Sequence, residues 1–203
     1  MKEFKLPIVS EYAQKGDRSP FKVLIATILS LRTKDHTTAT ASRKLFALAD
    51  TPEKILRLTA GRIEKLIYPV GFYRVKAKSI ITACKTLIDK HGGKVPSDLD
   101  ELLAIKGVGR KTANLVVTIG YNLPGICVDT HVHRISNRWG YVKTKTPDKT
   151  ELALRKKLPK KHWITYNDLL VTFGQNVCLP VSPYCSICKL KEFCPKIGVK
   201  KFR

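Results

Sequence analysis

The sequence contains 203 residues, with 38 Lys and Arg against 16 Asp and Glu, so its formal net charge at pH 7 is +22. This length allows one large domain or two small ones with a real apolar core, and basic residues spread along the whole chain favour a nucleic-acid partner over a ribosomal or merely alkaline protein. No apolar run approaches ~18 residues and no secretory or lipidation signal is present, which excludes a transmembrane helix and favours an intracellular protein without a membrane partner.

The first hundred residues predict helices. Residues 21–31 are strongly apolar, and Thr51-Pro52 is a capping residue followed by proline at the first helical position. Further along, Ile80, Cys84, Leu87 and Ile88 repeat at helical spacing, which predicts a buried stripe with Cys84 in the core. Because polar and apolar residues alternate nowhere over a useful length, we expect an all-α fold. The predicted helical segments are 4–19, 37–48, 53–58, 61–67 and 76–90.

A tight turn between two helices is predicted at Lys106-Gly107-Val108-Gly109. Glycine reaches positive φ without a Cβ clash, so two glycines around one apolar residue suit such a turn. The backbone N–H groups then face outward beside a helix N-terminus and form a concavity for an anion such as phosphate. Lys106, Arg110 and Lys111 add positive charge. We interpret the segment as a helix-hairpin-helix that holds a DNA backbone.

Lys111 lies in the first turn of the second hairpin helix and is the candidate nucleophile. An unperturbed lysine, with a pKa of ~10.4, is almost wholly protonated at neutral pH and is not nucleophilic. Partial burial, the positive helix end and the neighbouring Arg110 all disfavour the ammonium form. The alternative is a solvated lysine that only contacts phosphate.

A second polar cluster follows at Val128-Asp129-Thr130-His131, where helical spacing predicts a helix that begins near Asp129. An aspartate there suits a helix N-cap, and at a pocket edge it could also hold a cation or orient water. His131 and His133 point about 200° apart on a helix, so they cannot chelate one ion. We expect His131 to be partly buried and His133 to lie at the surface. We assign Arg134 to a phosphate contact, and we also count His131 among the DNA-binding residues.

The most specific pattern is Cys178-x6-Cys185-x2-Cys188-x5-Cys194. Four thiols within so short a segment suit a metal centre, because thiols stay reduced inside cells. Zinc usually takes two Cys-x2-Cys pairs and there is one here, so the uneven spacing favours a 4Fe–4S cluster over zinc, with disulfides third. Nearby lysines make the segment basic, which suggests a structural cluster that presents charge to DNA.

The hairpin, the Val128–His131 segment and the cysteine tail, in this order, resemble the endonuclease III family of helix-hairpin-helix DNA glycosylases. The resemblance extends from about Pro20 to Cys194. It implies two helical lobes: a six-helix barrel over 20–125, and a lobe of 1–19 plus 126–203 that carries the cluster. The active site would lie between them, with Lys111 on one side and Asp129 on the other. It also implies a monomer that acts on double-stranded DNA containing damaged bases or abasic sites.

The resemblance also implies the chemistry. A damaged pyrimidine is flipped out of the duplex. Lys111 attacks the sugar C1′ and leaves a Schiff base, and β-elimination cuts the strand 3′ to the lesion. Asp129 would stabilise positive charge on the sugar. Two alternatives stay open: a monofunctional glycosylase for mismatched or uracil bases, and a non-catalytic DNA-binding module with a structural metal.

Two positions depart from the family pattern. Arg32 stands where many members carry a glutamine thought to fill the gap left by the flipped nucleotide, so the opposite-base preference is open. Phe72 occupies the place of a second, usually aliphatic, wedge. Stacking between bases is one role for Phe72 and a place in the core is the other.

Overall fold

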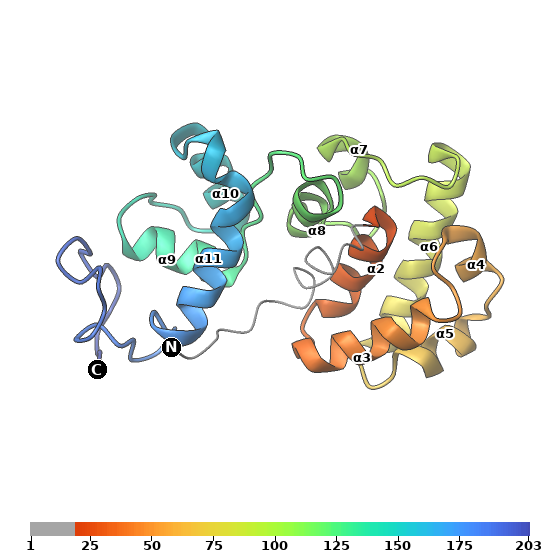
Figure 1. The fold of residues 1–203 in the computed structure, drawn as a ribbon, viewed down its shortest axis with the longest axis horizontal. Coiled ribbons are helices and arrows are strands. Elements are labelled where there is room, and N and C mark those ends of the chain that lie inside the picture. The colour runs from red at the N-terminus through yellow and green to blue at the C-terminus, as the bar shows by residue number, and fades with distance from the viewer. Residues whose placement is uncertain (1–18) are drawn as a thin grey trace. The chain divides into compact units, whose positions relative to one another are not determined.

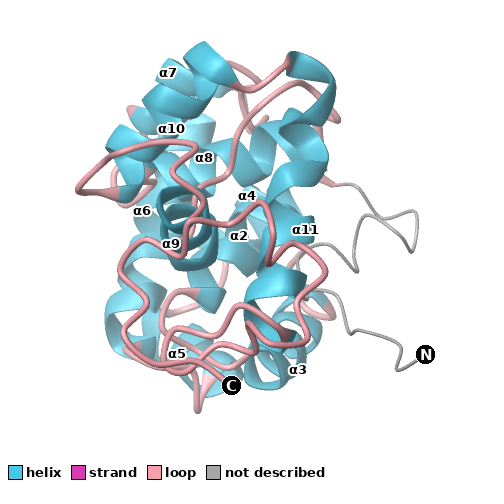
Figure 2. Cartoon of the chain, turned by 90° about the vertical axis from the view of Figure 1, so that its left-hand side faces the viewer, coloured by secondary structure: helices cyan, strands magenta, loops and turns pink. Residues whose placement is uncertain are grey.

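The computed structural model describes residues 19–203, and this part of the chain contains helices, turns and loops but no strand (Figure 1, Figure 2). The all-α prediction is therefore confirmed. No helix in this part is long and apolar enough to cross a bilayer. The α-helices are α2 (Pro20–Ser30), α3 (Asp35–Phe46), α4 (Pro52–Leu56), α5 (Ala60–Ile67), α6 (Tyr73–His91), α7 (Leu99–Leu103), α8 (Arg110–Leu115), α9 (Thr130–Arg138), α10 (Pro147–Lys157) and α11 (Trp163–Asn176). A π-helical turn, η1 (Val116–Gly120), continues α8, and a 3-10 turn, η2 (Lys160–His162), precedes α11.

The chain divides into two compact units between Leu123 and Pro124. In the described residues, the first unit holds α2 to α8 with η1, and the second holds α9 to α11 with the cysteine segment. The two-lobe assignment with a boundary at 125/126 stays a prediction. Its N-terminal part and the helix expected over 4–19 lie outside the described residues, apart from Ser19.

Helix α2 is the centre of the first unit. Its side chains are apolar almost all the way round and are buried from Val23 to Leu29, as expected for a helix surrounded by others. It packs against α3, α6, α8 and η1. The helix begins where the Ser19 hydroxyl accepts a hydrogen bond from the Lys22 N–H, with Pro20 at the first helical position.

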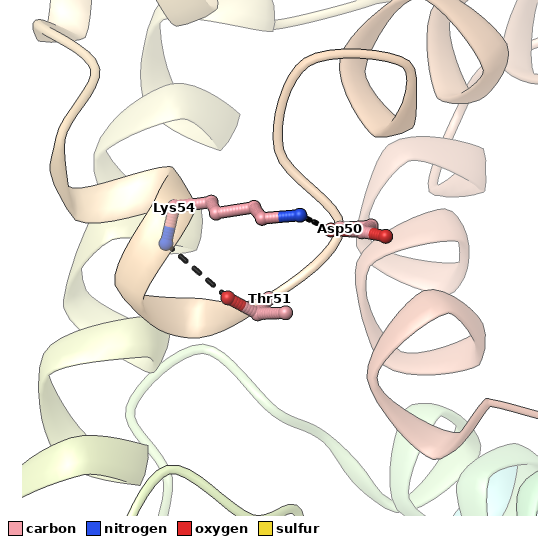
Figure 3. A network of polar contacts seen from close by, with 3 residues as sticks. All are labelled: Asp50, Thr51 and Lys54. Carbon is pink, nitrogen blue, oxygen red and sulfur yellow. Dashed lines mark hydrogen bonds and ion pairs between the residues drawn. The ribbon is translucent and has the colours of Figure 1, made fainter.

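Helix α4 begins as its sequence predicts. The Thr51 hydroxyl accepts from the Lys54 N–H at 3.3 Å, and Pro52 opens the first turn (Figure 3). The Lys54 ammonium also reaches back to Asp50 at 2.8 Å. This ion pair is solvent-exposed, so it contributes little to stability, and the cap with the fixed φ of proline defines the helix start.

Helix α6 carries the predicted buried stripe. Ile80, Cys84 and Leu87 are fully buried, while Ile88 is only half-buried. Burial raises the pKa of Cys84 to about 12, so its thiol is a core group. One turn before Ile80, the same stripe contains a lysine, Lys76, which is buried.

The second unit has a smaller apolar core. Helices α9, α10 and α11 pack their inner faces together around Val132, Ile135, Leu154 and Trp163. Beyond α11, the segment 177–203 winds through turns with hardly any buried side chain, Pro183 excepted. Its conformation therefore needs another source of stability.

Candidate active site

The predicted hairpin is formed by α7, a turn and α8. Gly107 has φ +90°, a left-handed conformation that favours glycine, and the Val108 N–H donates to the Ile105 carbonyl at 3.0 Å. The Val108 side chain is buried in the core of the first unit and anchors the turn. This turn has the geometry that the sequence predicts at Gly107.

Gly109 has a different reason to be glycine. Its φ is −93°, which any residue adopts, and a Cβ built there would meet nothing within 4 Å. The structure corrects the expectation that both glycines serve a positive φ. As the N-cap of α8, Gly109 exposes backbone on an open side of the turn. Lys106 is exposed beside it, and Arg110 and Lys111 are half-buried in the first turn of α8.

Asp129 is the N-cap of α9 in the second unit. Its Oδ1 atom accepts hydrogen bonds from the N–H groups of His131 and Val132, both at 2.9 Å. The capping role weighed from the sequence is therefore confirmed. Asp129 is only half-buried, and both bonds use the same oxygen atom. A cap of this kind fixes the carboxylate at the helix N-terminus.

His131 and Arg134 are brought together on the first turns of α9. The Arg134 Nη2 lies 3.2 Å from His131 Nδ1 and donates to the carbonyls of Gly174 and Cys178 at 3.3 and 2.9 Å. The guanidinium thus ties α9 to the end of α11 and to the first cysteine. The DNA contacts predicted for these two residues stay predictions. His133 is half-buried with Nδ1 2.6 Å from Thr150 Oγ1, so its expected surface position is wrong.

Arg32 and Phe72 lie on two neighbouring loops of the first unit. The Arg32 guanidinium carbon is 5.9 Å from the centre of the Phe72 ring, within cation–π range. Phe72 is 62% exposed, so it is not a core residue. Arg32 and Phe72 have φ of 53° and 57°, in the left-handed region that large side chains rarely adopt. The structure therefore excludes a place in the core for Phe72 and leaves stacking between bases.

Lys76 is a residue that sequence reasoning missed. Its ammonium donates to the carbonyls of Leu29 and Leu31 at 2.8 and 2.5 Å and to Thr33 Oγ1 at 3.0 Å. Burial lowers the pKa of Lys76 to about 8. A signal was available, because a lysine one turn before Ile80 interrupts an otherwise apolar stripe, and a buried lysine needs partners.

The four C-terminal cysteines line a single pocket together with Trp139 and Phe173. Burial raises the pKa of the Cys185 thiol, and the neighbouring thiols of Cys178, Cys194 and Cys188 raise it further. All four are free thiols. Within residues 19–203, no three His, Cys, Asp or Glu side chains are grouped as ligands of one metal ion. The four cysteines nevertheless line the same pocket.

Arg138 is a second residue that the sequence did not single out. Its guanidinium donates to Cys178 Sγ at 3.3 Å and to the carbonyls of Leu179 and Pro180 at 2.6 and 2.8 Å. Its own carbonyl accepts from the Ile197 N–H at 3.1 Å. Arg138 is 8% exposed. Such a buried guanidinium fixes the loop that follows the first cysteine and donates to the sulfur itself.

The all-helical fold and the hairpin define a class. The family profile for the HhH-GPD superfamily base excision DNA repair protein matches residues 25–160. Endonuclease III of Thermotoga maritima is 48% identical over 178 residues, which cover 88% of this chain and 84% of that protein. The mouse Endonuclease III-like protein 1 is 42% identical over 92% of this chain, and the chain spans 64% of its length.

A solved structure of a trapped Endonuclease III–DNA covalent intermediate superposes with a TM-score of 0.83 at 38% identity, covering 88% of this chain and 84% of that one. The chain belongs to the endonuclease III family of HhH-GPD base excision DNA repair proteins. The family resemblance inferred from the hairpin, the Asp129 segment and the cysteine tail is thereby confirmed.

Proposed function

We propose that the chain is a bifunctional DNA glycosylase and abasic-site lyase that removes oxidised pyrimidines from double-stranded DNA. The observation that carries this proposal is the position of Lys111. It lies in the first turn of α8, directly after a hairpin turn in which Gly107 and Gly109 are exposed. A nucleophilic amine beside a phosphate-binding turn suits attack on a sugar of the strand that the turn holds.

The hairpin turn holds the DNA backbone. Gly109 offers the open side on which a phosphate approaches, because no protein atom occupies the place of its missing Cβ. Lys106 and Arg110 supply positive charge on either side of Gly107, Val108 and Gly109. The net charge of +22 adds the sequence-independent attraction that lets such an enzyme search duplex DNA. His131 and Arg134 add contacts from α9.

Arg32 and Phe72 fill the gap left by the flipped nucleotide. The Phe72 ring is exposed and stacks between bases, while the Arg32 guanidinium donates hydrogen bonds to the orphaned base. Their 5.9 Å separation, from guanidinium carbon to ring centre, allows both to enter one gap.

The reaction runs through the Lys111 amine. The nitrogen lone pair attacks C1′, the bond between C1′ and the base breaks, and the base leaves with that electron pair and takes a proton. The nitrogen then loses a proton and its lone pair forms a C=N bond to C1′, while the C1′–O4′ bond breaks and O4′ takes a proton. This opens the sugar ring and leaves a protonated Schiff base between Lys111 and C1′. Removal of a C2′ proton then breaks the C3′–O bond, which cuts the strand 3′ to the lesion. Water hydrolyses the imine and frees the lysine.

Asp129 supplies the carboxylate of the reaction. The N–H groups of His131 and Val132 hold Oδ1 in place, so the charge is pre-oriented before substrate arrives. A fixed carboxylate stabilises positive charge that develops on the sugar and accepts protons that the amine releases.

Cys178, Cys185, Cys188 and Cys194 would hold a 4Fe–4S cluster. A cluster of this type is bound by four cysteine thiolates, and these four cysteines line one pocket. When bound, the cluster cross-links a segment that has almost no apolar core. The protein acts as a monomer. It works in a DNA-containing compartment inside the cell, because its substrate is there.

Borohydride trapping tests this function. The reducing agent converts the Schiff base to a stable amine, so the native chain should become covalently attached to an oxidised-pyrimidine duplex. Lys111→Gln should lose trapping and strand cleavage by at least about a thousandfold. Lys90→Gln, at an exposed lysine near the end of α6, carries the same charge change and should trap normally.

Three results would overturn parts of the proposal. Trapping of Lys111→Gln at the native rate refutes the nucleophile. Base release without strand cleavage indicates a monofunctional glycosylase instead. The absence of any base release from a panel of damaged duplexes indicates a non-catalytic binding module. Metal analysis decides the cofactor separately, since a colourless protein with stoichiometric zinc refutes the iron–sulfur cluster.

A further inference from the structure

Two strained residues stand out on the surface of the first unit. Arg32 and Phe72 adopt left-handed φ of 53° and 57°, a strained conformation for a large L-residue. Both side chains are exposed, so no apolar packing of their own offsets that cost. Strain of this kind persists only where the surrounding structure imposes it, and it is concentrated at functional positions.

Lys76 is the group that imposes it. The residue is 6% exposed, and its ammonium donates three hydrogen bonds within 2.5–3.0 Å to the loop that bears Arg32. Two acceptors are the carbonyls of Leu29 and Leu31 at the C-terminal end of α2, where the helix dipole favours a cation. The third is Thr33 Oγ1, so the three bonds bracket Arg32 on both sides.

The other loop leads directly into the helix that carries Lys76, and Thr33 joins it to the first. The Lys76 N–H donates to the Phe72 carbonyl at 3.0 Å, which makes Phe72 the N-cap of α6. Thr33 Oγ1 also accepts from the Gly71 N–H at 3.2 Å. A Cβ at Gly71 would lie 2.8 Å from the Arg32 carbonyl oxygen, so the two loops touch backbone to backbone. Lys76 thus bridges both loops from beneath.

A lysine is suited to this place. Only an ammonium offers three donors from one atom, and a neutral side chain would leave two carbonyls and one hydroxyl without that donor. Removing the partner of a buried acceptor is destabilising. Without the ammonium, the three bonds that hold the Arg32 loop against its strain are lost, so both residues can relax.

We propose that Lys76 is a positioning residue that couples Arg32 and Phe72 into one preassembled wedge, and that it thereby sets how the base opposite the lesion is read. The proposal rests on the proposed function for its substrate, damaged duplex DNA. Lys76 touches no DNA itself. It acts through the loop 29–33 and through the first turn of α6.

The test reads the wedge without requiring catalysis. The fluorescent base 2-aminopurine is placed opposite a tetrahydrofuran residue, an abasic-site analogue that cannot react with an amine, and its emission is measured at saturating protein. The native chain should change the emission by at least about twofold, because the wedge alters the stacking of the orphaned base. Lys76→Met should lose more than about half of that change.

Three further variants separate coupling from general instability. Gly71→Ala pushes the loops apart from the other side and should reproduce the loss. Thr33→Val removes the hydroxyl that accepts from both Lys76 and the Gly71 N–H, keeps the two carbonyl bonds of Lys76 and should lose a smaller part. Lys85→Met removes an exposed lysine of the same helix and should behave as the native chain. Saturation is verified for each variant by anisotropy of the same duplex.

The second measurement is the single-turnover rate of base release with each of the four bases opposite the lesion, normalised to the trapped fraction. The ratio of the highest to the lowest base-release rate among the four opposite bases should shrink by at least about fivefold in Lys76→Met. If both Lys76→Met and Gly71→Ala keep the native change in emission and the native ratio of base-release rates, the coupling is overturned, even if their melting temperatures fall. An emission signal that depends on Lys76 in a chain that releases no base would uphold the coupling and refute the proposed function.

Discussion

The first unit and the cysteine segment 177–203 are stabilised in opposite ways. Among the described residues, 25 buried apolar side chains form one cluster in the first unit, against nine in the second. The segment itself buries almost nothing, and Val181, Ile187 and Phe193 are 80%, 77% and 85% exposed. Hydrophobic burial therefore stabilises the unit that bears the hairpin and Lys111, and it cannot stabilise the segment that bears the four thiols.

The segment has polar substitutes for a core. The Arg203 N–H donates to the Pro183 carbonyl and the Ser186 N–H to the Arg203 carbonyl, both at 2.8 Å, and Arg138 fixes the chain after Cys178. Single hydrogen bonds contribute only about 0.5–1.5 kcal/mol each. The proposed cluster would add the cross-links that such a small segment otherwise lacks. Removing it should therefore affect the cysteine segment and not the first unit.

The largest effect should follow removal of the proposed cluster. With the metal extracted, amide exchange in 177–203 should accelerate by about two orders of magnitude, because local opening then has no cross-link to oppose it. Exchange in 19–123 should stay nearly unchanged, since its core is independent of the thiols. Hydrogen exchange read by mass spectrometry measures both regions in one sample.

Alkylation provides the control for that experiment. The four cysteines of the pocket should become reactive once the metal is gone. Cys84 should remain protected, because it is fully buried and its pKa is raised to about 12. Equal acceleration of exchange in both regions would contradict the comparison.

A core substitution should have the converse effect. Ile80→Ala empties a fully buried position of α6 and should lower the free energy of unfolding by about 2–5 kcal/mol. The visible absorbance of the cluster should be unchanged in the native state. Urea denaturation followed by circular dichroism gives the first quantity. Leu48→Ala, at a side chain that is 50% exposed, is the matched control and should cost well under 1 kcal/mol.

Arg138→Met tests, at a single side chain, whether polar contacts stabilise the cysteine segment. The change removes the donors to Cys178 Sγ and to the carbonyls of Leu179 and Pro180. We expect a loss of about 1–3 kcal/mol and cluster loss at least about tenfold faster in the presence of a chelator. The decay of visible absorbance measures the rate. Lys156→Met, at an exposed lysine of α10, should match the native chain; equal decay in the Arg138 variant would refute its role.

The smallest stability effect concerns Asp129, where capping and charge can be separated. Asn caps helices as well as Asp, so Asp129→Asn should leave the unfolding free energy within about 0.5 kcal/mol of native, whereas Asp129→Ala should lose about 1 kcal/mol. Base release should nevertheless fall by about a hundredfold or more in both. If Asp129→Asn releases base at the native rate, the carboxylate serves only as a cap.

Local sequence patterns predicted those features of the helices that depend on one helix alone. The cap at Thr51 and the stripe of Ile80, Cys84 and Leu87 follow from neighbouring residues along one helix, and the structure has them. Gly107 likewise has the positive φ that its place in the turn demands. Gly109 does not have a positive φ. The space beside it is open, and this depends on what surrounds the hairpin and not on the turn itself.

Contacts between distant segments were not predictable in the same way. His133 was expected at the surface because its own helix offers no reason to bury it, and Thr150 of α10 supplies one. Lys76 meets carbonyls 45 and 47 residues earlier in the chain. No periodic pattern encodes such a pairing, since it arises only when α6 packs against the end of α2.

Composition and spacing were sufficient for the all-helical class and the hairpin, because each depends on residues that are close in the chain, and the family came from the resemblance of three such local motifs. The packing of remote segments was needed to assemble Arg32 and Phe72 under the control of Lys76, and to put Arg138 against Cys178 Sγ. The physical reason is that helix propensity and turn chemistry act over a few residues. A buried cation, in contrast, is placed by acceptors that folding brings to it from elsewhere.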